Sequence, residues 1–328
     1  MGVLLLTKSV FAIMIGFLSA TVCGLLLIPF LRRKHIGQRI SIYVGENHKK
    51  KEGTPTMGGL IFVVPTIIMT ILLVLTNKIE LTPNLIIILF VFTGYSFIGF
   101  LDDFLSIKKK NNEGLTKYQK LFLQLIIALV FFYLYMKKGG QTALIVSTLG
   151  INIEMGWFYG VFLLFILIGA SNAVNLTDGL DGLAGGLSAI AFIAFSLISI
   201  AVGFEEIGIF SFILTGALMG FLIFNTHPAK IFMGDTGSLA LGAVMAAVAI
   251  LTHREVTLLV VASVFVIETL SVILQVVWLR LFKHKLFLMT PLHHHFEKLG
   301  WEETDIVKLF WVVGLILTMA GIFFGVWL

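Results

Sequence analysis

The chain has 328 residues, of which 58% are hydrophobic and only 12% are charged, proportions far from those of soluble globular proteins. Its net charge is +5, but no basic module with interleaved aromatic residues is present, so nucleic acid is not an expected partner. The single cysteine, Cys23, excludes a disulfide framework within one chain. This composition predicts an integral membrane protein.

Ten apolar runs follow one another along the chain, each about 17–25 residues long or slightly shorter. A helix of that length crosses a hydrocarbon layer of about 30 Å, and in lipid its backbone satisfies its own hydrogen bonds. The sequence therefore predicts an all-α membrane protein of about ten transmembrane helices, organised as one domain over residues 1–328. The predicted spans are 10–31, 57–76, 84–107, 119–136, 157–173, 183–203, 208–224, 237–251, 256–281 and 306–327.

The basic residues are distributed unevenly between the two sides of this arrangement. Eighteen of the 23 Lys and Arg residues fall within 32–51, 108–120 and 280–308 or at Lys230, all on one side. Because positive charge collects in short cytoplasmic loops, that side is predicted to be cytoplasmic and both termini extracytoplasmic. The cytoplasmic loops show no internal repeat, which weakens the interpretation as a transporter built from inverted halves.

Aspartate has a more specific distribution. Five of the six aspartates lie in three short motifs on the predicted cytoplasmic side. Carboxylates at a membrane edge are costly to bury, so they usually pair with cations or mark a functional site. Three acidic loops beside many basic residues suggest a metal ion and a polyanion. The motifs are FLDDFLS with Asp102 and Asp103, NLTDGLDGLAGG with Asp178 and Asp181, and FMGDTGS with Asp235.

Each motif also has a structural interpretation. Asp102 and Asp103 suit a solvated helix end, and neighbours on a helix point about 100° apart, so only one of them need face a site directly. Helix packing explains the glycines around Asp178 and Asp181, but it does not explain two carboxylates beside Asn175. Asp235 suits a plain helix N-cap, although beside the other acidic loops a magnesium ligand is the better interpretation.

Other polar residues are candidates for substrate contacts. His293, His294 and His295 are adjacent, which disfavours a common zinc ion, so hydrogen bonding to phosphate or sugar oxygens is the preferred interpretation. Lys120 starts a predicted helix, where a lysine either anchors the helix or neutralises a phosphate. Phe232 precedes Asp235 by three residues and suits either base stacking or the membrane interface.

These motifs, together with GTPTMGG at 53–59 and PLHHHFEKLGW at 291–301, resemble the family of phospho-N-acetylmuramoyl-pentapeptide transferases. The wider superfamily of prenyl-phosphate hexosamine-1-phosphate transferases shares the paired aspartates, whereas TPTMGG with HHHFE marks the muramoyl branch. The resemblance covers nearly the whole chain. It implies ten helices with both ends outside, in agreement with the charge distribution.

Carried over to this sequence, the resemblance implies roles for twelve residues. Asp102, Asp103 and Asp235 would be catalytic, with Asp235 on Mg²⁺. Gln275, polar within a predicted span, suits an interhelical hydrogen bond equally well. The substrate-binding residues would be Lys120, Asn175, Asp178, Asp181, Asn225, Phe232, Gln275, His294 and His295.

The implied reaction transfers phospho-MurNAc-pentapeptide from UDP-MurNAc-pentapeptide to undecaprenyl phosphate, giving lipid I and UMP in peptidoglycan biosynthesis. The implied setting is the bacterial inner membrane, and family members suggest a homodimer. A sibling reaction with UDP-GlcNAc is the nearest alternative. A membrane transporter is the alternative of another class, for which Glu268 is the only acid predicted deep in a span. Direct attack by the lipid phosphate and a phospho-enzyme route both remain open, with direct attack favoured.

Overall fold

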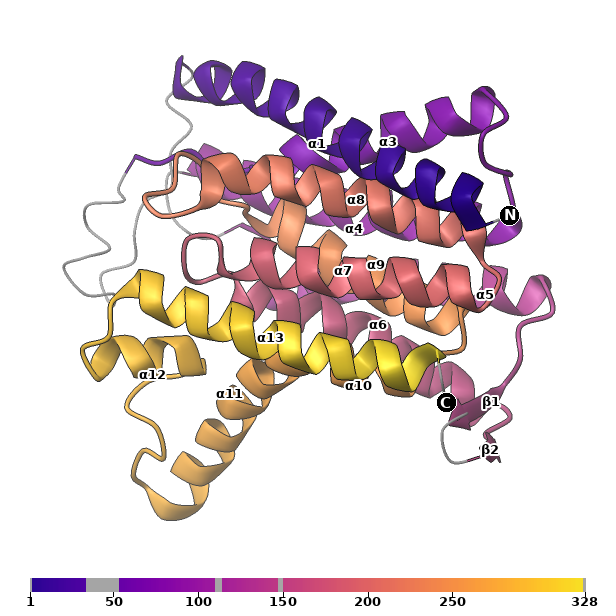
Figure 1. Ribbon diagram of the computed structural model, residues 1–328. Helices are drawn as coiled ribbons and strands as arrows, with labels where there is room; N and C mark the ends of the chain where they lie inside the picture. Colours follow the sequence, from indigo (N-terminus) through magenta and orange to yellow (C-terminus); the bar gives the residue numbers. More distant parts are fainter. Residues whose placement is uncertain (1, 34–52, 110–113, 147–149, 327–328) are drawn as a thin grey trace.

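A computed structural model describes residues 2–33, 53–109, 114–146 and 150–326 of the chain. Most of these residues form helices that lie side by side in one bundle, with the start of α1 and the end of α13 at the same end (Figure 1). The helices are α1 Gly2–Arg33, α3 Leu60–Leu75, α4 Pro83–Lys109, α5 Lys117–Lys137, α6 Phe158–Thr177, α7 Leu183–Ala201, α8 Glu205–Asn225, α9 Asp235–Leu251, α10 Glu255–Val261, α11 Ser263–Phe282, α12 Leu292–Lys298 and α13 Glu303–Val326.

All ten predicted apolar spans are helical, which confirms a multi-span all-α membrane protein. In the described ranges, eight helices are long and apolar enough to cross a membrane: α1, α4, α5, α6, α7, α8, α11 and α13. The predicted spans 57–76 and 237–251 form the shorter helices α3 and α9, of 16 and 17 residues. At 1.5 Å per residue these two are roughly 25 Å long, slightly less than the hydrocarbon layer.

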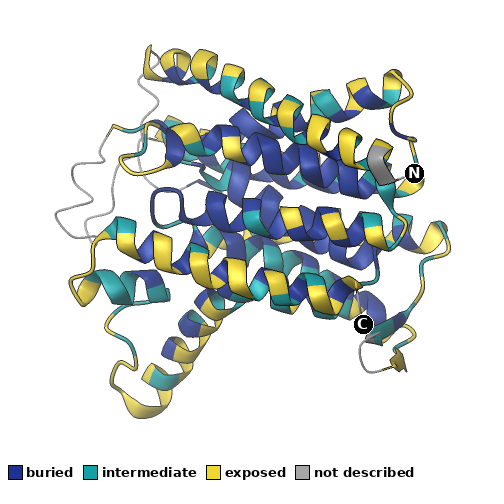
Figure 2. Cartoon of the chain, in the orientation of Figure 1, coloured by how far each residue is buried: buried dark blue, intermediate teal, exposed yellow. Residues whose placement is uncertain are grey.

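Helix α9 lies at the centre of the bundle, which explains its composition and its length. Every residue from Thr236 to Leu251 is buried, and α9 packs against α3, α4, α6, α7 and α10; Figure 2 shows the buried residues along the middle of the bundle. A helix enclosed by protein need not match the thickness of the lipid. Its first residue, Asp235, therefore lies among the ends of the neighbouring helices.

The prediction of one helix over 256–281 is wrong in one respect. The chain breaks at Ala262 into α10 and α11, and α11 diverges from the direction of the other helices (Figure 1). Two further elements were not predicted: α12, within the PLHHHFE segment, and an antiparallel hairpin of β1 Ala143–Val146 and β2 Ile151–Glu154. Both are too short to produce a hydropathy signal.

Helices α1 and α8 pack with their backbones in close contact. A Cβ atom on Gly16 would lie 2.1 Å from the carbonyl oxygen of Ile213, and one on Gly216 would lie 2.1 Å from that of Ile13. Small residues at such crossings allow the close approach that drives helix association in lipid. The remaining face of α1 carries exposed apolar side chains, as expected for a helix at the lipid boundary.

Candidate active site

The sequence-distant aspartates meet at one end of the bundle, where α4, α5 and α6 meet the first turn of α9. Asp102 and Asp103 come from α4, Lys120 from α5, Asn175 from α6, and Asp235 begins α9. Hydrogen bonds and ion pairs connect these residues to one another. The prediction that the three acidic motifs converge is therefore consistent with the fold.

Asp103 caps helix α9 from outside that helix. Its buried carboxylate accepts the backbone N–H groups of Asp235 at 3.2 Å and Thr236 at 3.0 Å, and the Thr236 hydroxyl at 2.6 Å. The first N–H groups of a helix lack intrahelical partners, and the positive end of the helix dipole favours a negative charge there. Asp103 thus satisfies the start of α9 and fixes the position of Asp235.

Asp235 has two polar partners from other helices. Lys120 Nζ donates to Asp235 Oδ2, and Asn175 Nδ2 donates to Oδ1 at 2.8 Å. The same amide of Asn175 also lies 2.9 Å from the Ser238 hydroxyl, one turn further along α9. Lys120 and Asn175 therefore hold the Asp235 carboxylate in one orientation.

Asp102 lies on the other side of Lys120. Its Oδ1 atom is 3.2 Å from Lys120 Nζ and accepts the backbone N–H of Leu115 at 2.9 Å. One ammonium group thus lies between the two carboxylates of Asp102 and Asp235. Adjacent residues of α4 consequently have different roles: Asp103 faces the backbone of α9, whereas Asp102 faces Lys120.

Asp178, the residue that ends α6, completes the cluster. Burial, followed by the nearby carboxylates of Asp235, Asp103 and Asp181, raises the pKa of its carboxyl from 3.8 to about 8. The backbone N–H of Gly234 donates to Asp178 and opposes that effect. Several carboxylates lie close together at this site, and a bound cation would offset the repulsion between them.

The GTPTMGG segment holds the loop that precedes Asp235. Gly58 N–H donates to the Phe232 carbonyl and Gly59 N–H to the Met233 carbonyl, both at 2.8 Å, and Phe232 N–H donates to Pro55 O at 2.8 Å. Glycine is required for this approach, since a Cβ on Gly59 would lie 2.3 Å from the Gly237 nitrogen. The segment therefore acts through its backbone, a role that residue types alone do not indicate.

A second group of metal-binding residue types lies beside this cluster. Asp181, His227 and Glu303 each offer one ligand atom, and these atoms lie within 4.8 Å of one another. His227 Nδ1 is 3.1 Å from Asp181 Oδ2 and 3.4 Å from Glu303 Oε2. The sequence did not predict His227 or Glu303 as site residues, because neither belongs to an acidic motif and they lie far apart in the chain, after α8 and at the start of α13.

Asn225 ends α8, and Phe232 lies in the loop between α8 and α9. The Asn225 amide is buried, accepts the Gly182 N–H at 3.1 Å and donates to the Ile231 carbonyl at 3.0 Å, so it joins the loop after α6 to the loop after α8. Phe232 is partly exposed next to the acidic cluster. Only Phe232 of these two presents its side chain toward solvent.

Gln275, His294 and His295 lie on α11 and α12 and have internal partners. Gln275 Oε1 accepts the N–H groups of Leu286 and Phe287 at 3.1 and 2.9 Å, so this amide fixes the loop after α11. His295 Nδ1 accepts the Leu288 N–H at 3.1 Å, and His294 Nδ1 lies 2.6 Å from Glu297 Oε2. The hydrogen bonds of Gln275 therefore join α11 to the loop that follows it, and not to another helix as the sequence also allowed.

The donor set of the acidic cluster suits a hard divalent cation. Asp102, Asp103, Asp178 and Asp235 supply only oxygen atoms, and among the described residues Lys120 is the one ammonium group in contact with them. Mg²⁺ prefers carboxylate oxygens together with phosphate oxygens and water. The group of Asp181, His227 and Glu303 includes an imidazole nitrogen and therefore suits Mg²⁺ less well.

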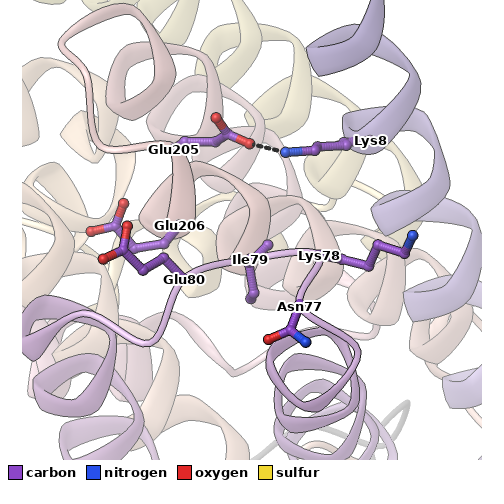
Figure 3. Close-up of a pocket in the computed structure, with 7 residues that line it drawn as sticks. All are labelled: Lys8, Asn77, Lys78, Ile79, Glu80, Glu205 and Glu206. Atoms are coloured by element: carbon purple, nitrogen blue, oxygen red, sulfur yellow. Dashed lines mark hydrogen bonds and ion pairs between the residues drawn. The ribbon is translucent and has the colours of Figure 1, made fainter.

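A cavity of about 360 Å³ lies at the opposite end of the bundle. Figure 3 shows its lining, in which Lys8 and Glu205 form an ion pair at 2.6 Å that joins α1 to α8. The aspartate motifs do not contribute to this cavity. We place the candidate active site at the acidic cluster, because the convergent carboxylates and not the cavity carry reactive chemistry.

Two family models match parts of this chain. The sequence model of glycosyl transferase family 4 matches residues 85–253, a range that includes Asp102, Lys120, Asp178 and Asp235. The phospho-N-acetylmuramoyl-pentapeptide-transferase signature 1 matches residues 51–63, which contain TPTMGG.

Full-length relatives are similar over almost the entire chain. A phospho-N-acetylmuramoyl-pentapeptide-transferase of Bacillus subtilis is 48% identical over 97% of this chain and 98% of the relative. That of Geobacillus thermodenitrificans is 49% identical with the same coverage, and that of Oceanobacillus iheyensis is 46% identical over 98% and 99%. The chain belongs to the phospho-N-acetylmuramoyl-pentapeptide-transferase family.

Proposed function

We propose that this protein transfers phospho-MurNAc-pentapeptide from UDP-MurNAc-pentapeptide to undecaprenyl phosphate, with release of UMP and formation of lipid I. The observation that carries the proposal is the contact of Asp102 and Asp235 with Lys120, with Asp178 near Asp235, at one end of a membrane bundle. A soluble nucleotide and a lipid phosphate can meet only where the bilayer ends. The identity of about 48% to enzymes named for this reaction supports the choice of substrate.

The chemistry requires positioning more than proton transfer. The second pKa of a phosphate monoester is about 6, so the lipid phosphate is largely dianionic at neutral pH and is already a nucleophile. Its approach to a diphosphate is opposed by like-charge repulsion. Lys120 lies between Asp102 and Asp235, where its ammonium group would neutralise phosphate charge.

Asp235 and Asp178 would hold Mg²⁺ at the open side of the cluster, with Asn175 fixing the Asp235 carboxylate. Bound there, Mg²⁺ supplies charge stabilisation to the diphosphate and to the departing UMP. Asp103 takes no part in this binding, because its carboxylate is used by the first turn of α9. Its role is to hold Asp235 in place.

The nucleotide-sugar would extend from this cluster along the loops after α6 and α8. Phe232 is the candidate for base stacking, since it is partly exposed beside Asp235. Asp181 and His294 are candidates for polar contacts with the sugar or the uridine. Asn225 and Gln275 would shape the pocket through the loops that they fix.

We favour direct attack by the lipid phosphate over a phospho-enzyme. Both reactive carboxylates already contact Lys120, whereas the largely dianionic lipid phosphate needs no further activation as a nucleophile. In the direct route, Asp102 orients the lipid phosphate or accepts its residual proton. Exchange of labelled UMP into the nucleotide-sugar without any lipid acceptor would contradict the direct route and establish a covalent intermediate.

The proposed setting is the bacterial cytoplasmic membrane, with the acidic cluster on the cytoplasmic side and both termini outside. The distribution of Lys and Arg supports this orientation, and the start of α1 and the end of α13 both lie at the other end of the bundle (Figure 1). The chain would act as one domain, in a homodimer.

One assay tests the function directly. The purified protein in detergent is given undecaprenyl phosphate with either UDP-MurNAc-pentapeptide or UDP-GlcNAc, with and without Mg²⁺. We expect lipid-linked product and UMP from the muramoyl donor only, and only with Mg²⁺. Product from UDP-GlcNAc alone would assign the sibling reaction. The transporter alternative is disfavoured, because Glu268 pairs with His293 and the acids of the cluster lie at one end of the bundle.

A further inference from the structure

Glu268 and His293 form a fully buried pair outside the acidic cluster. Glu268 lies on α11 and His293 on α12, and the side chains of both have 0% exposure. His293 Nδ1 is 3.2 Å from Glu268 Oε2, and the backbone N–H of His293 donates to Glu268 Oε1 at 3.2 Å. Both carboxylate oxygens therefore contact the same residue at the start of α12.

This contact defines the tautomer of the imidazole. An ionised carboxylate only accepts hydrogen bonds, so Nδ1 of His293 is the protonated nitrogen, and in the neutral ring Nε2 carries a lone pair. Nε2 is buried and has no hydrogen-bond partner among the described residues. A buried acceptor without a donor is uncommon and calls for an explanation.

Nε2 of His293 points at the turn that carries Asp178 and Asp181. A Cβ atom on Gly179 would lie only 2.3 Å from Nε2, so the ring nitrogen lies directly against the Gly179 backbone. Any side chain at position 179 would displace the imidazole. The pair thus connects α11 to the residue next to Asp178, whose carboxyl belongs to the acidic cluster.

We infer that Glu268 is a positioning residue for the transfer reaction. Through His293, Glu268 sets the position of the Asp178–Gly179 turn relative to Asp235. A differently placed ring would shift this turn, because Nε2 lies directly against Gly179. This role rests on the proposed function, because it is measured by the rate of the transfer reaction. It also explains Glu268, the acid predicted deep in a span, without a transporter.

A double-mutant cycle tests this connection. Glu268→Gln leaves a side chain that can accept only one of the two hydrogen bonds, whereas Gly179→Ala displaces the ring without removing a bond. Two matched controls make the same chemical changes elsewhere. Glu255→Gln alters a buried carboxylate that accepts from the Tyr159 hydroxyl, and Gly169→Ala adds a Cβ that meets nothing within 4 Å.

We expect Glu268→Gln and Gly179→Ala each to lower kcat about tenfold, and the double variant to lower it about tenfold as well, because both disturb one contact chain. Losses that multiply to about a hundredfold, or wild-type kcat in Glu268→Gln, would overturn the inference. The controls should retain kcat within about twofold. All variants are assayed below their unfolding temperatures, so that loss of fold is not read as loss of rate.

A spectroscopic measurement gives an independent check. In protein with ¹⁵N-labelled histidine, the side-chain signal that disappears in His293→Gln should report protonation at Nδ1, and an Nε2–H signal would contradict the assignment. This result does not depend on the substrate. If the unmodified protein fails to transfer phospho-MurNAc-pentapeptide, the proposed function fails, whereas the tautomer still tests the Glu268–His293 contact.

Discussion

The carboxylate of Asp103 accepts the backbone N–H of Asp235, so an aspartate of one motif caps the helix that an aspartate of another motif begins. The cap comes from a residue more than a hundred positions away in sequence, and it fixes the first turn of α9 in the interior of the bundle. Asp102, next to Asp103, contacts Lys120 instead. The two adjacent aspartates therefore differ in their contacts: Asp103 stabilises the start of α9, and Asp102 contacts the lysine of the proposed reaction site.

Removal of the cap should reduce stability as well as activity. Asp103→Ala leaves two N–H groups at the start of α9 without partners, and loss of a helix cap costs about 1–2 kcal/mol. We expect a lower unfolding temperature in detergent together with loss of turnover. Asp102→Ala is the matched comparison, and an equal loss of stability in both variants would contradict the assigned division of roles.

Asp235→Asn should remove turnover without removing the fold. The substitution retains the shape of the side chain but removes the charge that would bind Mg²⁺, and loss of one key charge in an active site typically lowers kcat by about 100-fold or more. Transfer to undecaprenyl phosphate is the measurement, with size-exclusion behaviour as the check on folding. A rate close to that of the unmodified protein would count against Asp235 as the metal ligand.

Lys120 should be required for the rate, and Lys117 should not. Lys120 lies between Asp102 and Asp235, whereas Lys117 is exposed in the first turn of α5. Lys120→Gln leaves these carboxylates without their ammonium partner, so we expect kcat to fall about 100-fold. Lys117→Gln provides the control and should alter kcat less than about twofold. Equal effects of the two substitutions would show that general positive charge, not the Lys120 contact, is what matters.

The stability of the metal-free protein should fall with increasing pH because of Asp178. Its pKa is raised from 3.8 to about 8 in the folded protein, so the folded state favours the protonated carboxyl. The contribution of Asp178 to the free energy of unfolding is complete below pH 3.8 and is lost as the pH rises through about 8. Thermal unfolding in a chelator at pH 6 to 9 measures this decline.

Asp178→Asn should flatten that decline, and addition of Mg²⁺ should stabilise the protein more at pH 9 than at pH 6. The exposed Asp305, which contacts Lys308, provides the control substitution Asp305→Asn. An unfolding temperature that is independent of pH in the unmodified protein would contradict the raised pKa of Asp178.

Some features of the site followed from the sequence and others did not. The convergence of FLDDFLS, NLTDGLDGLAGG and FMGDTGS was predictable, because all three motifs fall on the same predicted side of the membrane. The break at Ala262 was not, since neither Gly nor Pro marks it. The backbone contacts of GTPTMGG could not be predicted either, because residue types do not indicate which main-chain groups form hydrogen bonds with each other.

The sequence by itself determined the class of the protein, the number of its apolar segments and the common side on which the acidic motifs lie. These are local properties: a run of about 20 apolar residues matches the bilayer wherever it occurs in a chain. Only the tertiary structure decided that Asp103 caps α9, that Asp181 joins His227 and Glu303, and that Glu268 holds His293. These contacts depend on how each helix is rotated and how closely it approaches its neighbours, and both are fixed by packing among residues far apart in sequence.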